Sequence, residues 1–119
     1  MKSSSVKAKG RRLQNQVRDI IRERFPQLEP DDVKPALMGE SGNDIKLSPA
    51  ARKVFPFSIE CKNQESVSIW SWWKQTVKNL DKGTKPLLFF TRNHHETLVT
   101  MRMDDFFDLY EASLDKQAK

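Results

Sequence analysis

The sequence predicts an α/β domain in which a mixed central β-sheet is flanked by helices. Residues 13–25 and 67–82 carry apolar residues at helical spacing, and short apolar runs bounded by Gly, Pro and Asn lie between and after them. The continuous apolar run Pro86–Thr91 is typical of a buried strand. At 119 residues the chain can form one modest core. We therefore expect a flexible basic tail over residues 1–8 and a single domain over residues 9–115.

The first helix is predicted by five apolar residues at helical spacing: Leu13, Val17, Ile20, Ile21 and Phe25. Pro26 ends it. Its other faces are rich in arginine. We interpret Arg22 and Arg24 as a solvated face. Arg11 and Arg12 lie beside the basic tail and are candidate phosphate contacts.

A polar loop precedes the first predicted strand. It contains the turn signal Pro30-Asp31-Asp32, and we interpret the two aspartates as a turn or helix cap, not as a metal site. The segment Val33–Met38 is predicted to be a strand. Pro35 places that strand at an edge of the sheet, because proline cannot donate a ladder hydrogen bond.

A glycine-rich turn, Gly39–Asn43, leads into a second predicted strand over residues 44–47. Glycine lets the backbone or a phosphate approach closely, so Ser41 in this turn is a candidate DNA contact. Ser48 followed by proline predicts one turn of helix with Ser48 as its cap. A third strand is predicted over residues 57–62.

The second long helix is predicted over Val67–Lys82, with Ser66 or Ser68 as its cap. An apolar stripe at helical spacing is expected to face the core: Trp70, Trp73, Val77 and Leu80. Trp72 lies off this stripe, beside polar residues. A tryptophan in such a place would stack on an unpaired base or anchor a dimer.

Lysines spaced by four residues form a basic ridge on this helix, which includes Lys74 and Lys78. The ridge either faces DNA or is merely solvated. After the helix, Pro86–Thr91 and Thr97–Met103 are predicted strands, and Asp104 is predicted to cap a last helix. The adjacent histidines His94 and His95 are expected in a surface turn. The predicted order is helix, three strands, helix, two strands, helix.

The overall charge is +5 and the sequence pI is about 9.5, which suits a polyanionic partner, although many proteins reach this charge without binding nucleic acid. One cysteine excludes an intrachain disulfide and a cysteine-rich zinc site. No apolar run approaches membrane-spanning length, and no apolar segment of a signal peptide opens the chain. We expect an intracellular protein with no membrane partner.

Three charged residues in the apolar segments point to chemistry. Glu60 and Lys62 lie two apart on a predicted strand, so they share a face, and Cys61 points the other way. If the strand opened by Asp44 pairs beside them, two carboxylates and an ammonium group converge. Two carboxylates can hold Mg²⁺, or Mn²⁺ in its place. The metal polarises a phosphodiester, and the lysine orients water or offsets charge on the phosphate.

A charged pair on a strand is more often a solvated surface feature. Here the flanking residues Ile45, Leu47, Phe57 and Ile59 mark both segments as buried on at least one face. Charged groups are seldom buried without a purpose. We therefore treat Asp44, Glu60 and Lys62 as candidate catalytic residues.

The chain resembles the PD-(D/E)XK nuclease superfamily and, more narrowly, phage-encoded nucleases of the Holliday-junction-resolvase type. The matching segments are Lys9–Gln14, Gly39–Asp44, Leu47–Lys53, Ile59–Gln64 and the tryptophan-rich helix with Gln75. The resemblance implies a restriction-endonuclease-like core with the order αβββαββα.

The resemblance also assigns roles. It implies that Asp44, Glu60 and the backbone carbonyl of Cys61 bind the metal, that Lys62 completes the site, and that Gln75 reaches it. It places Lys9 among the DNA contacts. Resolvases of the archaeal type carry a glutamate on the first helix where this chain has Gln14. The amide of Gln14 can hold a metal-bound water but supplies no charge.

These observations favour a Mg²⁺-dependent endonuclease that hydrolyses DNA phosphodiesters, selects branched DNA or four-way junctions, and serves recombination. Symmetric cutting of a junction needs two active sites, so a homodimer is expected. Two alternatives stay open. One is a DNA-binding module that keeps the fold without catalysis, and the other is a nuclease acting on different DNA or on RNA.

Overall fold

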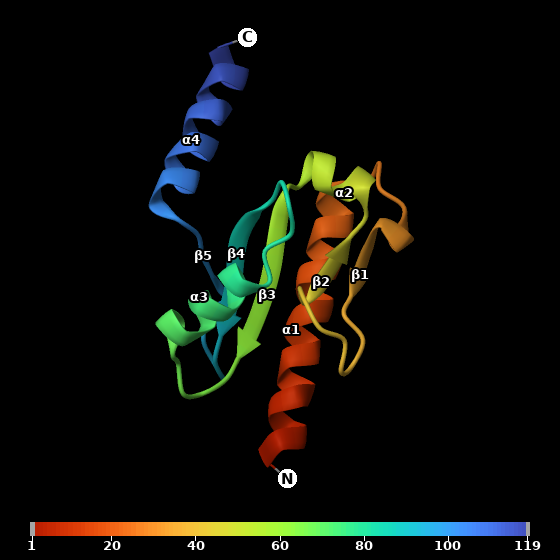
Figure 1. Cartoon of the computed structure of the whole chain (residues 1–119), viewed down its shortest axis with the longest axis vertical. Coiled ribbons are helices and arrows are strands. Elements are labelled where there is room, and N and C mark those ends of the chain that lie inside the picture. Colours follow the sequence, from red (N-terminus) through yellow and green to blue (C-terminus); the bar gives the residue numbers. More distant parts are fainter. Residues whose placement is uncertain (1, 119) are drawn as a thin grey trace.

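The computed structural model describes the backbone of residues 2–118 and the side chains of residues 5–116 (Figure 1). Its elements are α1 (Lys2–Arg24), the 3-10 turn η1 (Pro30–Asp32), β1 (Val33–Pro35), β2 (Ile45–Leu47), α2 (Pro49–Val54), β3 (Phe57–Asn63), α3 (Ile69–Lys78), β4 (Lys85–Thr91), β5 (Leu98–Thr100) and α4 (Met103–Ala118). The order of the long helices and of the strands is the predicted one.

The five strands form one mixed sheet in the order β1-β2-β3-β4-β5. Every neighbouring pair is antiparallel except β3 and β4, which are parallel and joined by α3. Pro35 lies on the edge strand β1, as predicted. The strand that carries Glu60 and Lys62 is thus the central one, hydrogen-bonded to a neighbour on each side.

Helices α1 and α3 cover opposite faces of the sheet (Figure 1). Leu13, Val17 and Ile21 on α1 pack in one buried cluster with Ile59 and Cys61 of β3, and with Val33 and Ile45. The alternate residues of β3 face α3, which packs Trp72 against Phe90 of β4 with ring centroids 6.0 Å apart. Glu60 and Lys62 are therefore on the α3 side of β3.

Helix α1 differs from the prediction in three ways. It begins at Lys2, so the tail expected over residues 1–8 is helical from residue 2 onward; the segment contains no proline, and Lys and Ala favour a helix. Ile20 is exposed. Arg22 is not part of a solvated face, because its guanidinium donates to the carbonyls of Val33 (2.6 Å) and Pro30 (2.8 Å) and ties α1 to β1.

Helix α3 buries a different face from the predicted one. Trp72 and Thr76 are buried, whereas Trp70 of the predicted stripe is 84% exposed, Trp73 and Val77 are partly buried, and α3 ends before Leu80. Both stripes have helical spacing, and the polar Thr76 concealed the correct one. Its hydroxyl is satisfied inside the core by donating to the Trp72 carbonyl at 2.8 Å. Trp72 therefore neither stacks on bases nor anchors a dimer.

The remaining elements are close to their predicted positions. Ser48 caps α2 by accepting the Ala51 N–H, and its hydroxyl donates to Asp32, whose carboxylate also accepts the Glu29 N–H. The prediction that Asp32 serves a turn is thus confirmed. Strand β1 ends at Pro35 and β5 covers only three residues, both shorter than expected. Helix α4 begins at Met103, one residue before the predicted cap.

Candidate active site

The start of β2 places Asp44 against the middle of β3. The Asp44 N–H donates to the Ile59 carbonyl (2.9 Å), and the Cys61 N–H donates to Asp44 Oδ2 (2.7 Å). These two hydrogen bonds clamp the aspartate between the backbones of the residues on either side of Glu60. The sequence hypothesis that the Asp44 strand pairs beside Glu60 is confirmed, with Ile45 opposite Ile59.

Glu60 and Lys62 share a face of β3, as predicted. Glu60 is 2% exposed, and its Oε2 lies 3.6 Å from Lys62 Nζ. Its other oxygen, Oε1, is buried and has no hydrogen-bond partner among the described residues. An unpaired buried carboxylate oxygen is costly unless a ligand completes it. Cys61 points into the α1 core, where burial raises the pKa of its thiol well above the usual value, so it is no nucleophile.

The two carboxyl groups hold protons unusually tightly. Burial first, and then the charge of Asp44, raises the pKa of Glu60 to about 7, while Lys62 opposes the shift. Burial also raises the pKa of Asp44, against the lowering effects of the Cys61 N–H, the Lys62 charge, and hydrogen bonds with Glu60 and Gln14. Two acids that share so small a space titrate as one unit. A bound cation would favour the ionised forms of both carboxyl groups.

A cavity of about 460 Å³ lies over this acidic pair. Its walls come from α1, the loop after β1, the end of β3, and α3. The lining includes Lys7, Gly10, Arg11, Gln14, Leu37, Met38, Glu40, Asn63, Gln64 and Gln75, besides Asp44, Glu60 and Lys62. The structure thus gathers all five residues predicted to be catalytic, although they lie on four separate segments of the chain.

The family comparison agrees with this geometry. The family model described as "Phage putative PDDEXK endonuclease" matches residues 5–119. The chain belongs to this family. The match confirms the resemblance to PD-(D/E)XK phage nucleases. No curated protein matches the chain, and no solved structure does. Among the described helices of this endonuclease-family protein, none has the length and apolar character to span a membrane.

The residues predicted to contact DNA are spread more widely than the catalytic ones. Arg11 lines the cavity, whereas Arg12, Lys74 and Lys78 are exposed outside it. Ser41 is exposed too, and its carbonyl accepts a hydrogen bond from Lys46 Nζ at 2.7 Å. The roles of these residues in DNA binding stay predictions.

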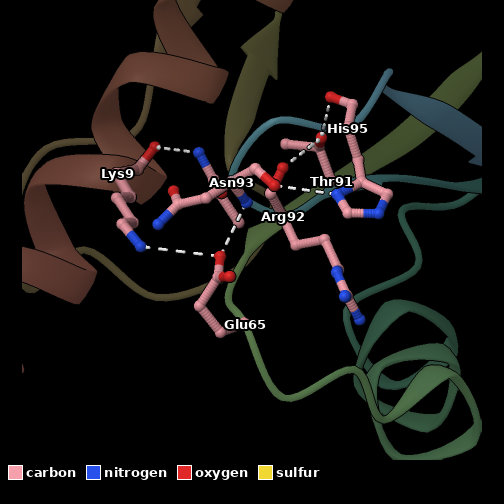
Figure 2. A network of polar contacts seen from close by, with 7 residues as sticks. Lys9, Glu65, Thr91, Arg92, Asn93 and His95 are labelled. Atoms are coloured by element: carbon pink, nitrogen blue, oxygen red, sulfur yellow. Dashed lines mark hydrogen bonds and ion pairs between the residues drawn. The ribbon is translucent and has the colours of Figure 1, made fainter.

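Lys9 takes part in a polar network that joins α1 to the ends of β3 and β4 (Figure 2). Its carbonyl accepts a hydrogen bond from Asn63 Nδ2 (3.2 Å), and its Nζ lies 3.7 Å from Glu65 Oε2. Glu65 also accepts the Asn93 N–H at 2.6 Å. Part of the Lys9 charge is therefore directed at Glu65, and the network fixes the cavity wall where Asn63 lies. His95 lies with Asn93 in the surface turn between β4 and β5, as predicted, and its Nδ1 is 2.8 Å from the Asn93 carbonyl oxygen.

Sequence reasoning missed a contact that holds the residue before Asp44 in place. Asn43 is buried, and its Nδ2 donates to Asp81 Oδ2 at 2.6 Å. The Asp81 N–H in turn donates to Ser58 Oγ at 2.9 Å. The glycine-rich turn is thereby pinned to the loop after α3. Asn43 and Asp81 are 38 residues apart, and no local signal connects them.

The donor set at the centre of the cavity suits a hard divalent cation. Carboxylate oxygens come from Asp44 and Glu60, and the described residues offer no cluster of three His, Cys, Asp or Glu side chains. Mg²⁺ is commonly held by one or two carboxylates and keeps several waters, whereas structural zinc requires four protein ligands. The orphaned Glu60 Oε1 is an available ligand atom.

The raised pKa of Glu60 predicts a pH-dependent stability without metal. Its folded pKa of about 7 exceeds the ordinary 4.5, so its stabilising contribution is complete below pH 4.5 and is lost as pH rises through 7. The melting temperature in EDTA should fall across this interval. Glu60→Gln should flatten the profile, and saturating Mg²⁺ should offset the fall. An identical profile for wild type and Glu60→Gln would contradict the assignment.

Proposed function

We propose that this protein is a Mg²⁺-dependent endonuclease that hydrolyses DNA phosphodiesters, with branched DNA as its preferred substrate. The supporting observation is the Asp44–Glu60 pair, buried in the floor of an open cavity with Lys62 3.6 Å from Glu60. Burying two acids side by side is unfavourable for folding, and such pairs cluster at functional sites. Family membership supports the same reaction class.

Asp44 and Glu60 would hold the cation, and the Cys61 carbonyl would be a third protein ligand. When bound, Mg²⁺ or Mn²⁺ would polarise the phosphodiester and lower the pKa of a water molecule. Lys62 would orient the attacking water or offset charge developing on the phosphate. The amides of Gln14 and Gln75 line the same cavity and would position water or a phosphate oxygen.

Arg11 and Lys7 on α1 would draw the DNA backbone into the cavity, since both are exposed cations on its wall. Arg12, Lys74 and Lys78 would extend this electrostatic surface beyond the cavity. Phosphate contacts of this kind position the duplex without reading its sequence. The overall charge of +5 agrees with a nucleic-acid partner.

Replacing Lys74 or Lys78 with alanine should weaken DNA binding without lowering the turnover of bound DNA. Each lost phosphate contact should reduce the slope of log affinity against log salt by roughly one unit. Binding titrations at several salt concentrations measure this slope. Lys53→Ala, an exposed lysine on α2, is the matched control. An unchanged slope would show that Lys74 and Lys78 do not contact the DNA phosphates.

The test of the proposed function is cleavage of a labelled four-way junction beside a duplex and a single strand of equal length. We expect cutting in Mg²⁺, loss of cutting in EDTA, and preference for the junction. Equal cutting of all three substrates would leave a general nuclease. Cutting of an added RNA strand of equal length, but of none of these three, would change the substrate class.

The second candidate is a DNA-binding module without catalysis, which Gln14 favours. This residue lines the cavity but adds no charge to it, so the cation would have only two carboxylates. Tight DNA binding with no cleavage of any substrate in Mg²⁺ or Mn²⁺ would establish this function and overturn the enzymatic one.

A further inference from the structure

Helix α4 presents an apolar stripe that the rest of the chain leaves uncovered. Large apolar residues lie at i, i+3, i+4, i+7 and i+11: Met103, Phe106, Phe107, Tyr110 and Leu114. Each is between 45% and 71% exposed, and Leu109 widens the stripe. Figure 1 shows α4 projecting away from the sheet, with the C-terminal end clear of the other elements. A stripe of this length on one helix marks a contact surface.

The link between α4 and its own domain is polar and weak. Lys85 Nζ at the start of β4 lies 3.5 Å from Asp105 and 3.6 Å from Asp108. The Lys85–Asp108 pair is open, with side chains 46% and 67% exposed, and such pairs stabilise little, whereas the Asp105 side chain is only 12% exposed. These contacts fix the direction of the first two turns. The apolar stripe itself stays between 45% and 71% exposed, which leaves it available to another molecule.

The charge of α4 excludes two kinds of partner. The helix has five acidic residues and one lysine, a formal charge of −4, so the rest of the chain carries +9 against the whole-chain +5. An acidic helix is repelled by DNA phosphates. Interfacial membrane helices carry Lys and Arg on the polar face, and α4 carries mainly Asp and Glu there. The complementary partner is a basic protein surface that contains an apolar hollow.

The body of this same chain has such a surface. A hollow of about 190 Å³ lies between the start of α3 and strands β4 and β5, with an apolar lining of Val67, Phe90 and Leu98. Its rim carries side chains of both signs, Arg92 and Glu96, together with His95. Leu98 is about half exposed. The apolar stripe of α4 thus has an apolar hollow as its counterpart, and the positive charge of the rest of the chain complements the negative charge of the helix.

We propose that two copies of this chain form a two-fold dimer in which each α4 lays its apolar stripe against the other copy and places an aromatic side chain of that stripe in its hollow. Each copy contributes one helix and one hollow, so the contact is reciprocal and closes on itself. The interface leaves the cavity above Asp44 open, because none of its residues belongs to that cavity. Two active sites would then act on one DNA, although the dimer itself does not depend on catalysis.

The test uses the full-length chain and measures mass by sedimentation or light scattering at micromolar concentration. Wild type should be a dimer. The double variant Phe106→Lys, Phe107→Lys should be monomeric, and so should Leu98→Arg in the hollow. Ile20→Lys, at an exposed apolar position on α1, is the matched control and should stay dimeric. Circular dichroism should show that all variants fold.

Mixing the two monomeric variants tests the reciprocal contact. The α4 variant keeps its hollow and the Leu98→Arg variant keeps its α4, so the mixture should form a heterodimer with one intact half-interface. If no heterodimer forms, α4 does not bind the hollow of the other copy, and pairing of α4 with α4 is favoured instead. A monomeric wild type, or a dimer that survives the Phe106→Lys, Phe107→Lys change, would overturn the proposal. Because mass is the readout, a dimer without cleavage would refute only the nuclease function.

Discussion

Asp44→Asn and Glu60→Gln should each abolish DNA cleavage, lowering the rate by about a hundredfold or more, while DNA binding survives or improves. Each change keeps the size of the side chain and removes one of the two carboxylates proposed to bind the metal. It also removes a negative charge that would face the DNA phosphates in the proposed complex. Loss of cutting with retained binding separates a ligand role from a folding role.

The measurement is single-turnover cleavage at saturating Mg²⁺, paired with binding to the same DNA in EDTA. Asp31→Asn is the matched control, since it removes the same charge from a side chain that is 94% exposed and does not line the cavity. Cleavage by either site variant at close to the wild-type rate would show that the cation is held elsewhere.

The convergence of the candidate catalytic residues was predictable because their signal is local. Glu60 and Lys62 are two residues apart on a strand whose apolar neighbours fix which face they share. Asp44 needed one further step, the pairing of two adjacent strands, and neighbours in sequence are usually neighbours in a sheet. The burial of α1 followed from Leu13, Val17 and Ile21, whose spacing admits one helix face.

What could not be predicted depends on contacts between distant segments. The buried face of α3 was ambiguous because three tryptophans offer two apolar stripes, and only packing against Phe90 selects Trp72. Arg22 resembled a surface arginine until β1 supplied carbonyl acceptors for its guanidinium. The hydrogen bond from Asn43 to Asp81 joins two loops that no periodicity connects.

The exposure of α4 could not be predicted from the sequence either. Its apolar stripe is periodic and would ordinarily indicate a helix packed on the core. The three-residue strand β5 and the short connection after it instead direct the helix away from the sheet. The sequence reveals that this face is apolar, and only the fold reveals that no element of the same chain covers it in the described part of the molecule.

Lys62→Ala should lower the cleavage rate by about a hundredfold with little change in the Mg²⁺ concentration needed for half-maximal activity at high pH. Lys62 Nζ is close enough to Glu60 to act on charge in the cavity, and it is no metal ligand. Lys34→Ala, an exposed lysine on β1, is the matched control. A wild-type rate for Lys62→Ala would leave Lys62 without a catalytic role.

A pH profile separates the two ways in which Lys62 could act. Its charge lowers the pKa of Glu60, so Lys62→Ala should raise that pKa further and move the onset of activity to higher pH. If Lys62 served only to keep Glu60 ionised, alkaline conditions would restore the wild-type rate to the variant. If it acts on the attacking water or the phosphate, the onset shifts but the plateau rate stays low. We expect the second result, because the cavity described here offers Lys62 both the Glu60 carboxylate and the space above it.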